Sequence, residues 1–102
     1  MHIEINTDNH IHNDESVERH VRQALDGSLA RFADQVTRIE VHLHDKNADK
    51  KGGRDKHCVL EAKLEGRPPV ACSDEADSLA AAITGAAKKL QRRLDHDLGR
   101  LS

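Results

Sequence analysis

Four short stretches of the chain alternate between apolar and polar residues. They cover residues 2–6, 38–44, 58–65 and 70–72. Alternation with a period of two is typical of a β-strand that buries one face and exposes the other. The inward positions of the first and third stretches are Ile3, Ile5, Cys58, Leu60, Ala62 and Leu64. The pattern therefore predicts four strands, each of which needs a cover on one side only.

Two longer stretches repeat apolar residues every three or four positions, which is the period of a helix with one buried stripe. The first stripe consists of Val17, Val21, Ala24, Leu25, Leu29 and Phe32. It predicts a helix of about 18 residues. Asn13, Asp14 and Ser16 precede or open this stretch, and each is a residue type that caps helix N-termini.

The second helical stripe consists of Leu79, Ile83, Ala86, Leu90, Leu94 and Leu101. We expect Ser73 or Asp74 to cap this helix, because the acidic residues at 74–77 would then lie in its first turn, where the helix dipole favours negative charge. A helix over residues 74–101 would be about 42 Å long. Its C-terminal end is therefore expected to project beyond the sheet, whereas Ile83 and Leu90 should be buried against it.

The order of these elements is strand, helix, three strands, helix. It predicts an α+β fold of β-α-β-β-β-α order, in which a four-stranded sheet carries both helices on one face. The first helix would be a right-handed crossover between two parallel strands. Residues 66–69 predict a turn, and residues 45–57 predict a polar loop around Gly52 and Gly53. We expect a single domain over residues 1–102.

Composition narrows the class of protein. Charged residues make up 33% of the 102 residues and hydrophobic ones 36%, so the core is thin, and Phe32 is its only aromatic residue. No apolar run approaches the length of a membrane span. The chain begins with a strand pattern rather than a signal peptide. Cys58 and Cys72 fall on inward strand positions, which favours buried thiols in a reducing cytoplasm, although a disulfide remains an alternative.

Charge is unevenly distributed along the chain, although the formal net charge is only −2. Residues 88–100 have a net charge of +3 and residues 74–77 a net charge of −3. A helical projection places five basic side chains along one flank of the second apolar stripe: Lys89, Arg92, Arg93, His96 and Arg100. Such a flank suits phosphate backbones, but taken alone it is more often a solvated face with cations matched to the helix dipole.

Further basic residues lie in the predicted loop. Residues 45–57 have a net charge of +2 and could fold over RNA. Proteins that read single-stranded RNA stack bases on exposed aromatic rings. Because Phe32 lies on the core stripe, we expect any RNA binding to rest on shape and backbone charge.

Few other residues in the sequence suggest a metal site or a catalytic site. His42, His44 and His57 are predicted to lie on the outward face of neighbouring strands, and three histidines can hold zinc. No fourth ligand stands at metal-site spacing, so we expect no stoichiometric zinc. The sequence has no nucleophile elbow, no phosphate-binding glycine-rich loop and no His-Glu-x-x-His motif. We therefore expect neither an enzyme nor a cofactor.

Three segments resemble a known family. They are Val-Ala-Cys-Ser at 70–73, Ser-Leu-Ala-Ala-Ala-Ile at 78–83 and Lys-Lys-Leu-Gln-Arg-Arg-Leu at 88–94. With Arg19, His20 and Val21 in the first helix, they resemble the ribosome hibernation-promoting factor family, also called sigma-54 modulation or ribosome-associated inhibitor proteins. Ala80 stands where that family usually has tyrosine. The resemblance covers essentially the whole chain and corresponds to the short form, without a C-terminal dimerisation domain.

The resemblance implies a fold like that of a double-stranded RNA-binding domain. It also implies binding to ribosomal RNA in the decoding cleft of the small subunit, where mRNA and tRNA would otherwise lie. The residues expected to bind RNA are Lys88, Lys89, Arg92, Arg93, His96, Arg100, Arg19 and Arg22. Among them, Lys89 and Arg92 match the family's basic helix positions.

Our leading hypothesis is a cytoplasmic translation inhibitor that occludes the decoding cleft by binding the rRNA backbone. It predicts a protein that is a monomer off the ribosome and has no membrane or small-molecule partner. The alternative is a diverged protein-binding module on the same fold without ribosome affinity. A histidine-based metal protein is a third possibility.

Overall fold

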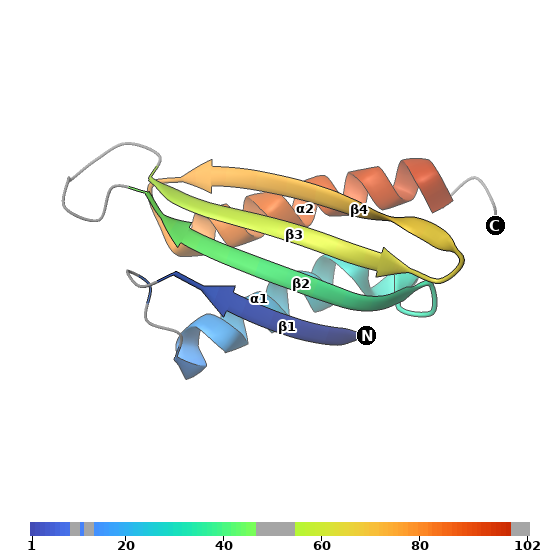
Figure 1. Cartoon of the computed structure of the whole chain (residues 1–102), viewed down its shortest axis with the longest axis horizontal. Coiled ribbons are helices and arrows are strands. Elements are labelled where there is room, and N and C mark those ends of the chain that lie inside the picture. The colour runs from blue at the N-terminus through green and yellow to red at the C-terminus, as the bar shows by residue number, and fades with distance from the viewer. Residues whose placement is uncertain (9–10, 12–13, 47–54, 99–102) are drawn as a thin grey trace.

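A computed structural model of the chain describes residues 1–8, 11, 14–46 and 55–98. Its elements are β1 (His2–Thr7), α1 (Glu15–Leu29), the 3-10 turn η1 (Ala30–Phe32), β2 (Val36–Asp45), β3 (Lys56–Leu64), β4 (Arg67–Ala76) and α2 (Leu79–Leu98). Figure 1 shows one sheet with both helices packed behind it. The predicted α+β fold and its β-α-β-β-β-α order are confirmed.

The sheet has the strand order β1-β2-β3-β4. β1 pairs with β2 in parallel, so α1 is the crossover between them, as predicted. The pairs β2–β3 and β3–β4 are antiparallel. Because each strand lies beside its neighbour in sequence, β2, β3 and β4 form a simple meander next to the crossover unit.

The alternating pattern places apolar side chains in one layer between the sheet and the helices. The inward positions of β2 and β3 are fully or almost fully buried: Val36, Ile39, Val41, Leu43, Cys58, Leu60, Ala62 and Leu64. From the helices, Val21, Leu25 and Leu29 of α1 meet Ile83, Leu90 and Leu94 of α2 in the same cluster. Phe32 is buried in η1. The expected burial of Ile83 and Leu90 is confirmed.

The start of α2 differs from our expectation. The prediction that Ser73 or Asp74 caps this helix is wrong, because both residues belong to β4, which continues to Ala76. Ser78 provides the cap instead: its Oγ accepts a hydrogen bond from Ala81 N at 3.1 Å. Asp74 follows the alternation of β4 and sits opposite Cys58, on the helix side of the sheet. At the start of α1, Asp14 Oδ1 accepts a hydrogen bond from Val17 N at 3.1 Å. Asp14 is therefore the N-cap among the three predicted candidates.

The far end of α2 stays packed on the sheet. Leu94 is fully buried and Leu98, the last helical residue, is 7% exposed. The described helix of 20 residues is about 30 Å long, shorter than the predicted 42 Å. The expected projection therefore does not occur over the described residues. Arg100, Leu101 and residues 47–54 of the loop lie outside them.

The two cysteines are free thiols. Burial, assisted by the nearby Asp74 carboxylate, raises the pKa of Cys58 to about 12, so this thiol behaves as a small core hydrophobe. Cys72 is only partly buried, and its pKa is raised mainly by desolvation. Among the described residues, neither helix has the length and apolar character needed to cross a bilayer.

Candidate nucleic-acid interface

The two helices lie side by side, point the same way and keep a fixed register. His20 Nε2 of α1 lies 3.1 Å from Ala80 O and 3.3 Å from Thr84 Oγ1 of α2. Near their C-terminal ends, Arg31 Nη1 forms a salt bridge of 2.9 Å with Asp95 Oδ1. The pairs His20–Thr84 and Arg31–Asp95 both join residues 64 positions apart in sequence. The helix layer therefore forms one platform, which we call the helix platform, and the packing of α1 on α2 sets the spacing of their basic side chains.

Three basic side chains occupy the outer side of this platform. At 100° per residue, Arg19 lies opposite the buried stripe of α1, and Lys88 and Arg92 lie opposite that of α2. All three are exposed, and none has a hydrogen bond or salt bridge to another described residue. Arg22 is also exposed and without such a partner, on the flank of α1 that faces away from α2. We call Arg19, Lys88 and Arg92 the outer cations.

Lys89 is placed differently from its neighbour Lys88. Its Nζ donates hydrogen bonds to Ser73 O at 3.1 Å and to Asp74 Oδ1 at 2.9 Å, so it faces β4. Gly85 makes this arrangement possible, because a Cβ at that position would lie 1.8 Å from Asp74 Oδ2. A charge expected to meet RNA is therefore already paired within the fold.

Arg93 and His96 share a single acidic partner. Arg93 Nε donates to Asp97 Oδ2 at 2.8 Å, and His96 Nδ1 lies 3.1 Å from Asp97 Oδ1. His96 and, after it, Arg93 lower the pKa of Asp97. The predicted basic flank is thus divided: Arg92 has no acidic partner among the described residues, whereas Lys89, Arg93 and His96 contact acids. Arg100 lies outside the described residues.

Two further basic residues contribute to this region without having been singled out in the sequence. Arg31 bridges to Asp95 and lies 5.1 Å from the centre of the Phe32 ring. Arg67 lines a shallow groove of about 150 Å³ together with Arg93 and Asp97 at the edge of the sheet. No sequence spacing connects these residues, because α2 and its partners come together only through the tertiary packing.

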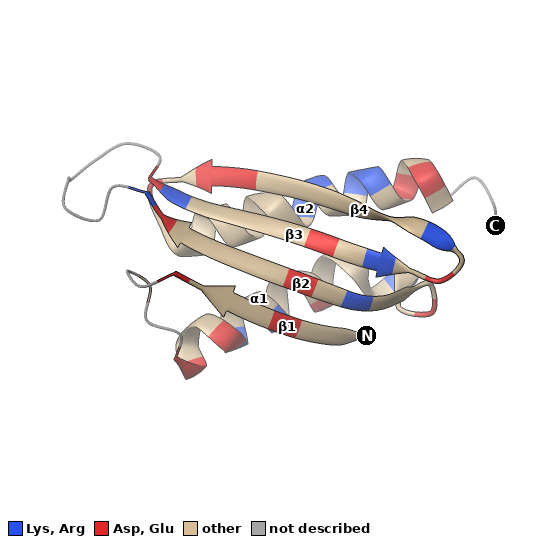
Figure 2. Ribbon diagram, viewed as in Figure 1, with Lys and Arg blue, Asp and Glu red and all other residues tan. Residues whose placement is uncertain are grey.

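The open face of the sheet carries charges of both signs. Figure 2 shows acidic positions on all four strands and basic positions on β2, β3 and β4, whereas the C-terminal half of α2 carries a cluster of basic positions. On that face Arg38 pairs with Glu4, and Lys63 Nζ lies 2.6 Å from Glu61 Oε1 and 3.6 Å from Glu40 Oε2. The Lys63–Glu61 hydrogen bond raises the pKa of Lys63 and lowers that of Glu61. The cations of this face are therefore neutralised by glutamates.

The three outward histidines also lie on the open face. His44 and His57 are directly opposite each other on β2 and β3, with their ring centres 6.2 Å apart. His57 Nε2 lies 3.9 Å from Glu75 Oε1 and His44 Nδ1 lies 3.8 Å from Asp8 Oδ2. Within the described part of the chain, no three or more histidine, cysteine or acidic side chains are arranged to hold a metal ion. The absence of stoichiometric zinc stays a prediction.

Solved structures share this architecture. The N-terminal domain of Protein Y from Thermus thermophilus superimposes with a TM-score of 0.76 and 20% identity, over 95% of this chain and 99% of that one. A ribosomal subunit interface protein from Coxiella burnetii gives a TM-score of 0.74 and 17% identity, over 95% and 97%. At these identities the likeness shows the fold alone.

Sequence comparison extends this likeness to a family. No curated protein matches the chain. The family model of the sigma 54 modulation protein / S30EA ribosomal protein group matches residues 3–102, which is nearly the whole sequence. That span includes both helices with their basic residues and all four strands, apart from the first residue of β1. The chain therefore belongs to the sigma 54 modulation protein / S30EA ribosomal protein family.

Proposed function

We propose that this protein inhibits translation by binding ribosomal RNA of the small subunit through the outer surface of α1 and α2, in the cytoplasm. Bound in the decoding cleft, it would occupy the space of mRNA and tRNA. The observation that carries the proposal is the set of outer cations, which are exposed on the helix platform and have no partner among the residues that the structure describes. The family is one of ribosome-associated modulators rather than enzymes, which supports this choice.

The proposed mechanism needs only occlusion. Lysine and arginine side chains that neutralise phosphates release condensed counterions, which favours binding at low salt. Such contacts position a protein on RNA without reading its sequence. Phe32, the only aromatic side chain apart from histidine, is buried, so base stacking contributes little. We therefore expect recognition of backbone shape, with no turnover and no cofactor.

We expect the difference between the two faces to orient the protein as it binds. On the open face Arg38 and Lys63 are paired with glutamates, whereas the outer cations of the helix platform form no salt bridge with another described residue. Charge that is separated between two faces orients a protein during its approach to a charged partner. A net charge of −2 is therefore compatible with RNA binding, because binding depends on where the charges lie rather than on their sum.

Changing Lys88→Glu together with Arg92→Glu tests the proposal. The two substitutions reverse the outer cations of α2 while leaving the core and the internal salt bridges intact. We expect loss of co-sedimentation with small ribosomal subunits at moderate salt. For the wild-type protein, four contacts from Arg19, Arg22, Lys88 and Arg92 correspond to a slope of about −3 to −4 in log K against log salt.

Two milder double variants test whether RNA binds the helix platform or the open face of the sheet. Lys88→Gln with Arg92→Gln removes two charges from the platform, and Arg38→Gln with Lys63→Gln removes two from the open face. We expect only the first pair to weaken binding and to reduce the magnitude of the slope by about 2. Equal weakening by both pairs, or wild-type protein that does not bind small subunits at low salt, would overturn the proposal.

A further inference from the structure

Arg67, the first residue of β4, lies on the helix side of the sheet although the alternation of the strand would place it on the open face. Odd-numbered residues further along β4, such as Ala71, face the open side. In the ladder with β3, however, the pair Ala62–Val70 is followed by the pair Leu64–Arg67, so β4 has one extra residue in this interval. Such a β-bulge reverses the faces of the residues beyond it. Arg67 therefore shares the face of Leu64, beneath the helices.

The sequence of the bulge explains this reversal. The extra length of β4 falls at Pro68 and Pro69, and proline is accommodated at bulges and on edge strands because it has no N–H to donate to a ladder. β4 is an edge strand of the sheet. Gly66, with a φ of 73°, makes the turn immediately before it. The direction of Arg67 is therefore set by the backbone.

A groove of about 150 Å³ lies where Arg67 approaches α2, and Arg93 and Asp97 line its other side. Arg67 is exposed and has no hydrogen bond or salt bridge to another described residue. Arg93 donates to Asp97 through Nε, which leaves its terminal nitrogens without a described partner. Two arginines against one aspartate give the lining a net charge of +1. The remaining walls are apolar, which strengthens the attraction for an anion: Leu64, Pro68, Pro69 and Val70.

This groove continues the basic surface of the helix platform. Arg93 directly follows the outer cation Arg92, and at 100° per residue it lies on the flank of α2 that faces β4. Figure 2 shows basic positions at the start of β4 and on the C-terminal half of α2, at the same end of the molecule. An RNA strand that neutralises Arg92 would pass next to the groove. Its phosphates would then reach Arg67 at a high effective concentration.

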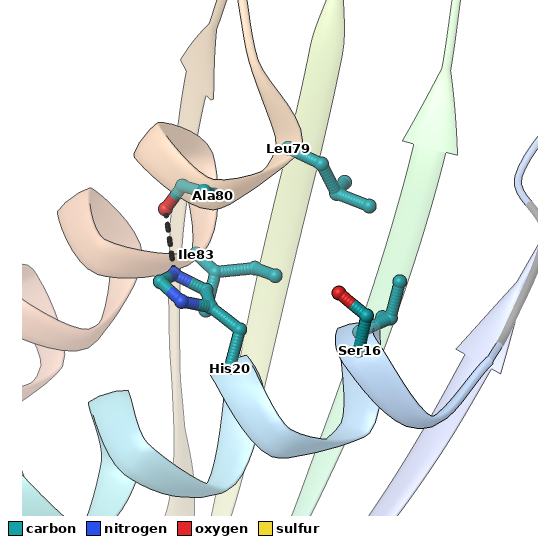
Figure 3. A pocket seen from close by; sticks show the side chains of 6 residues that line it. Ser16, His20, Leu79, Ala80 and Ile83 are labelled. Atoms are coloured by element: carbon teal, nitrogen blue, oxygen red, sulfur yellow. Dashed lines mark hydrogen bonds between the residues drawn. The ribbon is translucent and has the colours of Figure 1, made fainter.

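A pocket of about 140 Å³ near His20 provides a contrast. It opens between the N-terminal ends of the helices and is lined by Ser16, Val17, His20, Leu79, Ala80 and Ile83. Figure 3 shows the His20 ring turned towards Ala80, whose carbonyl oxygen lies 3.1 Å from Nε2. Neither lysine nor arginine is among the residues that line this pocket, so it has no cation to hold a phosphate.

We infer that the groove between β4 and α2 binds one phosphodiester group of RNA, with Arg67 as a contact beyond the two helices. The inference rests on the proposed function and extends the RNA surface around the edge of the sheet. Arginine suits this role because its planar guanidinium donates two parallel hydrogen bonds to phosphate oxygens. Contacts of this kind position RNA without reading its bases.

Arg67→Gln tests the inference on small ribosomal subunits. The substitution removes one phosphate contact at an exposed position, so the fold should survive. We expect binding to weaken about tenfold and the magnitude of the salt slope to fall by about 1. Arg67→Lys keeps the charge and should retain most of the affinity.

Arg67→Gln combined with Ala71→Arg is the matched control. Ala71 is exposed on the open face of the same strand, opposite Glu61 in the ladder with β3. The second substitution therefore restores the net charge on the side of the sheet away from the groove. We expect the affinity to stay at the level of Arg67→Gln, because the position of the charge decides binding.

NMR of the isotope-labelled protein tests the groove without the ribosome. A short single-stranded oligouridylate is titrated while the arginine Nε–H resonances are followed. We expect saturable shifts of Arg67 and Arg92 together, and loss of the Arg93 shift in Arg67→Gln. Uridine monophosphate should need at least about a hundredfold higher concentration, because the outer cations do not hold it beside the groove.

The outcomes separate this inference from the proposed function. If Lys88→Glu with Arg92→Glu loses subunit binding while Arg67→Gln binds like wild type, the groove is not an RNA contact. If wild-type protein does not bind subunits but the oligonucleotide still shifts Arg67, the phosphate site stands and the proposed function fails. Full recovery through Ala71→Arg, or an acidic peptide that shifts Arg67 more strongly than the oligonucleotide, would also overturn the inference.

Discussion

The basic residues of α2 differ in whether they already form a salt bridge with an acidic residue. Lys88 and Arg92 are unpaired among the described residues, whereas Lys89 is bonded to Asp74 and Arg93 to Asp97. A paired cation attracts phosphate less strongly, because its acidic partner cancels part of its charge. The net charge of residues 88–100 therefore overstates the attraction that this segment offers to RNA.

Replacing the shared acid Asp97 tests this difference. Asp97→Asn should free Arg93 and His96, raise the affinity for small subunits and increase the magnitude of the salt slope by up to about 1. Asp34→Asn, between η1 and β2, is the matched control, because it makes the same change in net charge outside the two helices, at an exposed acid without a salt bridge to a described residue. An equal rise in affinity for both variants would show that only overall charge matters.

The same variant has a defined pH dependence. His96 and Arg93 hold the folded pKa of Asp97 below its ordinary value. A lowered folded pKa stabilises the protein at pH values above the unfolded pKa, near about 3.9, and this contribution disappears as the pH falls through the folded pKa. Denaturant unfolding should therefore show Asp97→Asn less stable than wild type at pH 7 and equal to it at pH 2. A difference that persists at pH 2 would contradict this explanation.

At the scale of elements, the contact between β4 and α2 depends on one glycine. Gly85→Ala should destabilise the protein by about 1–3 kcal/mol, because the new Cβ would overlap the Asp74 carboxylate. Gly27→Ala in α1 is the control: nothing lies within 4 Å of its Cβ position, so helix propensity should stabilise the protein by about 0.5–1 kcal/mol. Thermal or denaturant unfolding measures both, and the loss at Gly85 should shrink in an Asp74→Ala background.

Helices and strands were predictable wherever the repeat of apolar positions ran over enough residues to define its period. The stripe from Val17 to Phe32 and the alternation around Val41 and Leu60 each identify an element and its buried face. The boundary between β4 and α2 was not predictable in the same way. Asp74 and Glu75 fit the first turn of a helix by composition, yet the ladder with β3 and the bond to Lys89 keep Asp74 in a strand. Tertiary contacts outweighed the local preference.

The candidate site was predictable in outline only. The helical projection identified α2 as the basic element. It could not show that Lys89 meets Asp74 or that Arg31 meets Asp95, because these partners are distant in sequence and are joined by packing. The pocket near His20 was equally hidden, since its two walls come from helices 60 residues apart in the chain. The sequence reveals charge and burial within an element but not pairing between elements.

For the whole molecule, stability rests on one thin aliphatic layer. Ile83→Ala and Leu90→Ala each remove part of the contact between α2 and the sheet, and we expect losses of about 2–5 kcal/mol in the free energy of unfolding. Lys88→Ala, on the exposed side of the same helix, should change it by less than about 0.5 kcal/mol. Losses below about 1 kcal/mol for both core variants would contradict the packing described here.

The parallel pairing of β1 with β2 has a consequence for the order in which the chain folds. β2, β3, β4 and α2 follow one another in sequence and in space, whereas β1 meets β2 only after α1 has crossed the sheet. Contacts between residues far apart in sequence form late, because closing the intervening loop costs entropy. We expect β1 amides to exchange with solvent through local opening, ahead of the β2–β3 ladder. Native-state hydrogen exchange would then show the N-terminal strand detaching while the meander remains folded.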